Sequence, residues 1–129
     1  MAGSHLSAIP IADVFATGGF TVNPGNKFVA LNVPEHRLFV LTDVIVFPVV
    51  KKSDPDFTIQ YSVEEHVPGS PNTGVGVKFQ YTAVGTGENW SEHFTGGIKF
   101  LGGKDVVVVS TTNSKGQVGF QLLGYFTNP

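Results

Sequence analysis

Apolar and polar residues alternate along most of the chain, and clusters of Gly, Pro, Asn and Asp interrupt the alternation at regular intervals. A period of two is typical of β-strands, because successive side chains of a strand point to opposite faces of the sheet. The pattern predicts about eight or nine strands, which we place at residues 14–22, 27–33, 37–47, 57–63, 75–84, 90–94, 98–101, 105–112 and 117–127. We therefore predict an all-β antiparallel sandwich of jelly-roll type.

The segment from Arg37 to Phe47 departs from the alternation, because both of its predicted faces are largely apolar. One predicted face carries Leu38, Val40, Thr42, Val44 and Val46, and the other carries Phe39, Leu41, Asp43, Ile45 and Phe47. A strand with two apolar faces is typically covered on both sides. The second cover can come from a loop or from a neighbouring subunit, so this segment is a first indication of a homo-oligomer.

The composition agrees with one folded domain. Of 129 residues, 41% are hydrophobic and 14% are charged, whereas about a quarter of the residues of a typical protein are charged. This excludes disorder through excess charge. We predict a single β-sandwich domain over residues 8–129, after a flexible N-terminus at residues 1–7 that resembles a cloning remnant. The absence of cysteine excludes disulfides, thiolate zinc sites and cysteine nucleophiles.

The charges name no partner. The formal net charge is −2, and the eight Lys and Arg residues are scattered apart from the pair Lys51–Lys52. Nucleic-acid binding requires a clustered basic face, so we expect no nucleic-acid partner. The apolar segments are also shorter than the ~20 residues of a membrane span, so we expect no membrane insertion.

The C-terminal third resembles a known family. A segment at Phe94–Ile98 leads through Gly102–Asp105 into the valine run Val106–Val109, and the chain continues to Gly119–Phe126. This order is similar to the ending of C1q/TNF-like jelly rolls, which have a Gly-Asp-type turn before an apolar strand and finish on an aromatic-Gly-aliphatic strand. The resemblance implies a trimer with a binding role, as in the tip domains of bacterial adhesion fibres. No functional residue is carried over by it.

No metal motif is present. The four histidines stand alone in their segments, and no H-x-H pair occurs. Glu64-Glu65-His66 and Glu92-His93 could meet in space and ligate a metal, but we interpret them as loop and edge residues in water. Asp54 and Asp56 lack the further carboxylates of a calcium loop. We therefore predict no metal and no cofactor.

Trp90 is the candidate ligand-binding residue. Together with Tyr81, Glu88 and Asn89 it could form a platform for a sugar, because aromatic rings stack on pyranose faces while polar neighbours bind the hydroxyls. The more ordinary interpretation is a tryptophan packed in the core or at an interface. Asp43 stands out for another reason. A carboxylate within an apolar strand needs a partner, and Arg37, Lys27 or backbone amides could supply one, in a structural rather than a catalytic role.

These observations favour a non-enzymatic binding or adhesion module that recognises carbohydrate or protein through its loops, as a homo-oligomer with a trimer favoured. No G-x-S-x-G segment or other catalytic signature occurs. The alternative is a structural or assembly protein, such as a capsid, fibre or coat component, and a small metal-dependent barrel enzyme comes third. If the protein is an adhesin, we expect it outside the cell or at the cell surface.

Overall fold

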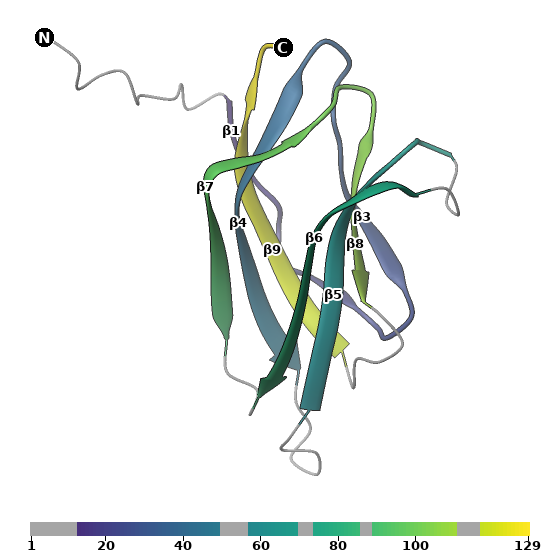
Figure 1. Cartoon of the computed structure of the whole chain (residues 1–129), viewed down its shortest axis with the longest axis vertical. Coiled ribbons are helices and arrows are strands. Elements are labelled where there is room, and N and C mark those ends of the chain that lie inside the picture. The colour runs from purple at the N-terminus through teal and green to yellow at the C-terminus, as the bar shows by residue number, and fades with distance from the viewer. Residues whose placement is uncertain (1–12, 50–56, 70–73, 86–88, 111–116) are drawn as a thin grey trace, which may run out of the picture.

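The computed structural model describes residues 13–49, 57–69, 74–85, 89–110 and 117–129. The described residues form nine strands: β1 (Val14–Ala16), β2 (Phe20–Val22), β3 (Lys27–Asn32), β4 (Leu38–Val49), β5 (Phe57–His66), β6 (Gly74–Gly85), β7 (Trp90–Phe100), β8 (Asp105–Ser110) and β9 (Gln117–Thr127). The prediction of an all-β antiparallel sandwich is thus confirmed (Figure 1). The expected flexible N-terminus at residues 1–7 lies outside the described residues. Within the described residues, no helix is long and apolar enough to cross a membrane.

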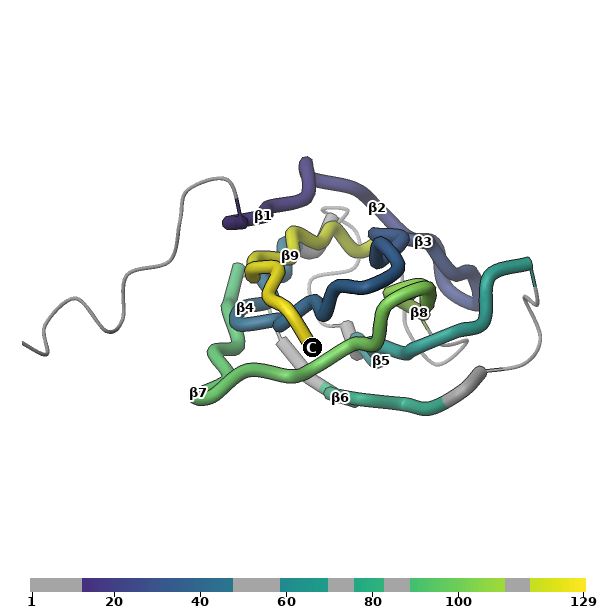
Figure 2. The backbone as a smooth tube through the Cα atoms, turned by 90° about the horizontal axis from the view of Figure 1, so that it is seen from above, coloured from purple at the N-terminus to yellow at the C-terminus, as the bar shows by residue number. Residues whose placement is uncertain are grey.

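The strands form two sheets that pack against each other. The first sheet has the order β1-β9-β4-β7, with β2 also paired to β9, and the second has the order β3-β8-β5-β6. All pairs are antiparallel, and they are nested: β1 and β2 pair with β9, β3 with β8, β4 with β7, and β5 with β6. Figure 2, seen from above, places β1 and β2 on one side of the sandwich and β6 and β7 together on the opposite side.

The core lies between the two sheets and is built from valines and aromatic rings. β-Branched and aromatic side chains suit a pleated surface, and here they interdigitate from both layers. Phe39 of β4 contacts the rings of Phe15, Phe100 and Phe126 at centroid distances of 5.8, 6.3 and 5.4 Å. Across the sandwich, Tyr61 of β5 meets Phe120 of β9 edge-on at 5.0 Å. The Phe39 contacts link strands of the first sheet, and the Tyr61–Phe120 contact joins the two sheets into one core.

A β-bulge at Thr42 changes which side chains of β4 face the core. The register of β4 shifts between Leu41 and Asp43 against both of its neighbours, so Thr42 has no cross-strand partner. Phe39 and Leu41 therefore share the core with Val44 and Val46, while Val40 shares the outer face with Asp43, Ile45 and Phe47. The predicted strict alternation from Arg37 to Phe47 is wrong, because an extra residue in a strand reverses every later side chain.

Three predicted boundaries also differ. The segment 14–22 forms two short strands, separated at Thr17–Gly19. The segments 90–94 and 98–101 belong to one strand, β7, with an irregularity at Gly96 and Gly97, whose φ values of 82° and 76° glycine adopts without strain. β5 extends to His66, so the predicted loop from Glu65 begins only at Val67. Residues 113–116, which separate the predicted strands 105–112 and 117–127, lie outside the described residues.

Candidate functional site

The outer face of the first sheet, turned away from the core, is largely apolar. It carries Val14, Ala16, Val40, Ile45, Phe47, Leu123 and Tyr125, as the register of β1, β4 and β9 shows. Val40 is buried although it lies outside the core cluster. The ring of Phe47 lies over Gly119 of β9, where an added Cβ would come within 1.9 Å of it. The expectation that this strand is apolar on both faces is therefore confirmed.

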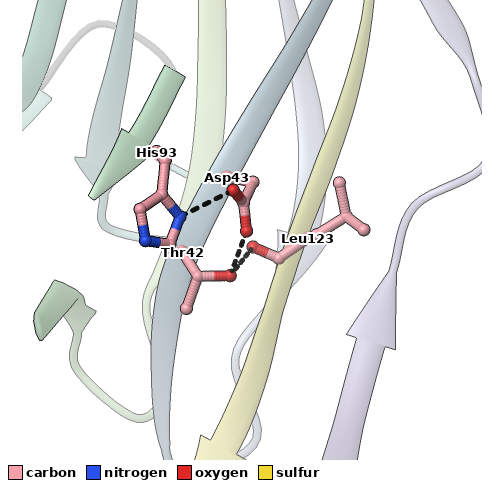
Figure 3. Close-up of polar contacts among 4 residues, drawn as sticks. All are labelled: Thr42, Asp43, His93 and Leu123. Atoms are coloured by element: carbon pink, nitrogen blue, oxygen red, sulfur yellow. Dashed lines mark hydrogen bonds and ion pairs between the residues drawn. The ribbon is translucent and has the colours of Figure 1, made fainter. Parts of the chain in front are cut away.

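A polar group interrupts this outer face at the bulge (Figure 3). His93 Nδ1 of β7 lies 2.8 Å from Asp43 Oδ1, and the hydroxyl of Thr42 donates to Asp43 Oδ2 at 2.8 Å. The same hydroxyl lies 3.2 Å from the carbonyl oxygen of Leu123. The bulge makes this arrangement possible, because it turns Thr42 and Asp43 away from the core in succession and sets Asp43 opposite His93.

Asp43 has a partner, as expected, but this partner is His93 rather than one of the groups proposed from the sequence. Arg37 binds Asp13 at 2.8 Å instead, and Lys27 lies on β3 in the second sheet. The pairing of His93 with Asp43 was not foreseen, because 50 residues separate the two and only the pairing of β4 with β7 brings them together. Nor was the contact with Thr42 foreseen, since it depends on the bulge.

The order of the hydrogen bonds does not suit nucleophilic catalysis. In a Ser-His-Asp triad the hydroxyl binds the imidazole, which takes its proton. Here the Thr42 hydroxyl binds the carboxylate instead, so His93 has no contact through which to deprotonate it. The pair is also open to solvent, with 67% of the His93 side chain and 34% of the Asp43 side chain exposed.

A second histidine–carboxylate pair lies on the outer face of the second sheet. His66 Nε2 is 2.8 Å from Glu64 Oε1, and Ser62 donates to Glu64 Oε2 at 2.5 Å. Only 8% of the His66 side chain is exposed. The interpretation of residues 64–66 as solvated loop residues is therefore wrong, because β5 continues through them and pairs with β8.

The neighbours of this second pair are also held by hydrogen bonds. Glu65 points to the other side and accepts the backbone N–H of Leu101 at 2.9 Å, and Asn32 donates to Asp105 at 2.5 Å. A shallow cavity of about 280 Å³ opens beside them, and it is lined by Lys27, Val29, His66, Val67, Gly69, Asp105 and Val107. His66 and His93 belong to different sheets, and within the described ranges no group of three His, Asp or Glu residues could hold a metal ion.

Trp90 and Tyr81 meet where β6 and β7 lie together, at the edge of the sandwich. Their ring centroids are 6.0 Å apart, and both half-buried side chains pack against the core. Asn89 is exposed, and Glu88 lies outside the described residues. The sugar platform stays a prediction. Phe79 and Phe94 extend the row of rings with an edge-on contact at 4.7 Å.

Two buried donors lie unpaired near this aromatic row. Trp90 Nε1 and the hydroxyl of Tyr61 have no hydrogen-bond partner in the described part of the chain. Burial raises the pKa of Tyr61 above the ordinary tyrosine value, and the charges of Glu92 and Tyr81 raise it further. Glu92 therefore lies close enough to Tyr61 for its charge to act on the phenol.

Comparison with known proteins adds no family. No protein-family model matches the chain, and no curated protein matches its sequence. The function is therefore argued from the geometry of the two outer faces and of the aromatic edge.

Proposed function

We propose that this protein is a non-enzymatic binding module that assembles into a homo-oligomer through the outer face of its first sheet. The observation that carries the proposal is that the polar side chains in the middle of this apolar face have partners within it. Asp43 binds His93 and Thr42, and Gln121 donates to the carbonyl oxygen of Thr17 at 3.1 Å. These contacts let Asp43 and Gln121 lose their water without being left unpaired.

A second copy of the same chain is the occupant that the charges favour. The face carries the Asp43–His93 pair, which joins β4 to the edge strand β7, and Lys99 on β7, so two copies meet without opposing clusters of like charge. The nested strand pairing is the order expected of a jelly roll, and the C1q/TNF-like ending makes a trimer the favoured stoichiometry. The ligand of the module is a carbohydrate or a protein.

Sedimentation velocity over a wide concentration range tests the assembly. We expect a discrete species of fixed stoichiometry, which Ile45→Asp should dissociate because it places a charge in the contact. The matched control is Val77→Asp, which also replaces an aliphatic side chain by a carboxylate but lies at an exposed position of the second sheet. It should leave the assembly intact. A monomer at every concentration would refute the proposed assembly.

The sugar-binding part of the proposal rests on the Trp90–Tyr81 ring contact at the edge where β6 and β7 lie together. A glycan array is expected to show binding by the native chain, reduced by Tyr81→Ser and retained by Tyr81→Phe, since the latter keeps the ring. An empty array together with an empty pull-down would count against a ligand at this edge.

A structural or coat protein is the second candidate, because the second sheet also exposes apolar side chains. Val29, Val67 and Val77 are 48, 37 and 57% exposed on or beside its outer face. Two different adhesive faces on one subunit produce open assemblies rather than closed ones. Light scattering separates the candidates, because an open assembly grows with concentration whereas a closed oligomer does not.

A further inference from the structure

We propose that the cavity on the outer face of the second sheet binds a small ω-amino acid, a molecule with an ammonium group at one end of an aliphatic chain and a carboxylate at the other. The cavity has a volume of about 280 Å³, at the lower end of the ~300–1,000 Å³ typical of ligand pockets. None of its lining residues belongs to the first sheet or to the Trp90–Tyr81 contact. The site is therefore separate from the proposed assembly and from the proposed sugar site.

One end of the cavity holds a carboxylate that no described cation neutralises. Asp105 is 7% exposed, and Asn32 donates to its Oδ1 at 2.5 Å. Asp105 forms no ion pair with a described residue. A neutral amide satisfies one oxygen but not the charge, and a buried carboxylate without a counter-charge is costly. A ligand ammonium at this end supplies the missing charge.

His66 adds a hydrogen-bond acceptor to the same end. It lies opposite Asp105 in the register of β5 and β8 and is 6% exposed. Glu64 engages its Nε2 at 2.8 Å, which fixes the ring and leaves Nδ1 without a hydrogen-bond partner among the described residues. Because the carboxylate accepts the proton of Nε2, Nδ1 is an acceptor in the neutral ring. Asp105 and His66 together thus suit a group with several N–H donors.

The opposite end of the cavity carries the ammonium group of Lys27. This exposed residue lies opposite Val109 on β8. Asp105 lies four residues earlier on the same strand, a span of about 13 Å at ~3.3 Å per residue. Lys27 and Asp105 form no ion pair with each other. A ligand whose ammonium binds Asp105 can therefore place a carboxylate at Lys27 only if its two charges are well separated.

Aliphatic side chains form the wall between the two charged ends. Val29 and Val107 lie opposite each other in the register of β3 and β8, and Val67 also lines the cavity. Val107 is buried although it lies outside the core cluster, whereas Val29 and Val67 are 48 and 37% exposed. Such a wall suits a methylene chain and has no group that binds a hydroxyl. It therefore favours an ω-amino acid over a sugar, and the separated charges favour it over an α-amino acid.

Isothermal titration calorimetry of the full chain with ε-aminocaproate tests the site. We expect saturable binding at one site. Norleucine has the same atoms but adjacent charges, and it should bind about tenfold more weakly because it cannot reach both ends. Hexanoate, which lacks the ammonium, should also bind about tenfold more weakly. Hexylamine, which lacks the carboxylate, should bind only about threefold more weakly, since an exposed ion pair contributes little.

Three variants assign the two ends. Lys27→Met should weaken the binding of ε-aminocaproate about threefold and leave that of hexylamine unchanged. Lys99→Met, the matched control, removes the same charge from an exposed position of β7 in the first sheet and should alter neither affinity. Asp105→Asn, which keeps an oxygen for Asn32, should weaken both ligands by about tenfold or more. Circular dichroism verifies the fold of each variant.

Methyl resonances of the native chain give a test that needs no variant. Adding ε-aminocaproate should shift those of Val29, Val67 and Val107 and leave that of Val77, which does not line the cavity, in place. No saturable binding, or shifts confined to other residues, overturns the site. Equal affinity for norleucine and ε-aminocaproate overturns the assignment of an ω-amino acid. Sedimentation and the glycan array test the proposed function separately, so either proposal can fail while the other stands.

Discussion

The two outer faces of the sandwich each carry one histidine–carboxylate pair with the same 2.8 Å separation, in opposite surroundings. His66 and Glu64 on the second sheet are 8 and 18% exposed, whereas His93 and Asp43 on the first sheet are 67 and 34% exposed. A buried pair costs much when it is broken, and an exposed pair contributes little to stability. The bond length alone therefore does not define the role. His66 is fixed as part of the fold, and His93 remains available to a partner.

The largest expected effect comes from breaking the buried pair. His66→Ala should lower the free energy of unfolding by about 3 kcal/mol, because it leaves Glu64 without its counterpart in a buried position. Urea denaturation followed by circular dichroism measures this. Glu64→Gln, which keeps a hydrogen-bonding oxygen for His66, should cost only about 1 kcal/mol. Equal losses in the two variants would show that the charge of Glu64, rather than the packing and hydrogen bond of His66, carries the contribution of the pair.

Gly97→Ala should strain the backbone of β7 where it passes Val40 on the same outer face as the exposed pair. Its φ is 76°, and an added Cβ would lie 2.2 Å from Val40 Cγ1, so we expect a loss of about 3 kcal/mol. Gly96→Ala is the matched control, because φ is 82° but no atom lies within 4 Å of the added Cβ. It should cost about 1 kcal/mol. Thermal unfolding of both variants tests whether the contact with Val40 matters beyond the backbone angle.

Tyr61 extends the comparison to a buried hydroxyl that has no hydrogen-bond partner among the described residues. Burial, with Glu92, raises its pKa in the folded chain, so the folded state holds this proton more tightly than the unfolded state. The contribution is fully present below the ordinary tyrosine pKa of about 10 and declines above it, by up to about 1.4 kcal/mol per pH unit. Urea midpoints at pH 8, 10 and 11 should therefore fall less steeply in Tyr61→Phe than in the native chain. Parallel profiles would contradict this.

The smallest expected effect comes from the exposed pair. His93→Ala should change the free energy of unfolding of the monomer by no more than about 0.5 kcal/mol, measured by urea denaturation at a concentration below any assembly. The same variant thus separates stability from association. A loss as large as that of His66→Ala would show that the two pairs are equivalent, despite their different exposure.

The sequence predicted the strands better than it predicted the faces. The strand predicted at 117–127 has the bounds of β9, and the strand predicted from Asp105 begins where β8 begins. The faces of β4 were assigned wrongly after Leu41, because a bulge leaves no local signal when apolar residues stand on both sides of it. The polarity of Glu65 and His66 favours a loop, and it gives no indication that both residues pair with β8. For the candidate site, the sequence indicated that Asp43 needs a partner, but it did not indicate that the partner is His93.

Alternation and composition by themselves determined that this chain builds an all-β sandwich with a strand apolar on both faces, because side-chain period and β-propensity are local properties. Only the tertiary structure decided that Asp43 binds His93, that His66 is buried and that Trp90 meets Tyr81. Each of these pairs joins residues of different strands, and their proximity depends on strand register. One inserted residue at Thr42 changes that register and so decides which polar groups meet on the outer face.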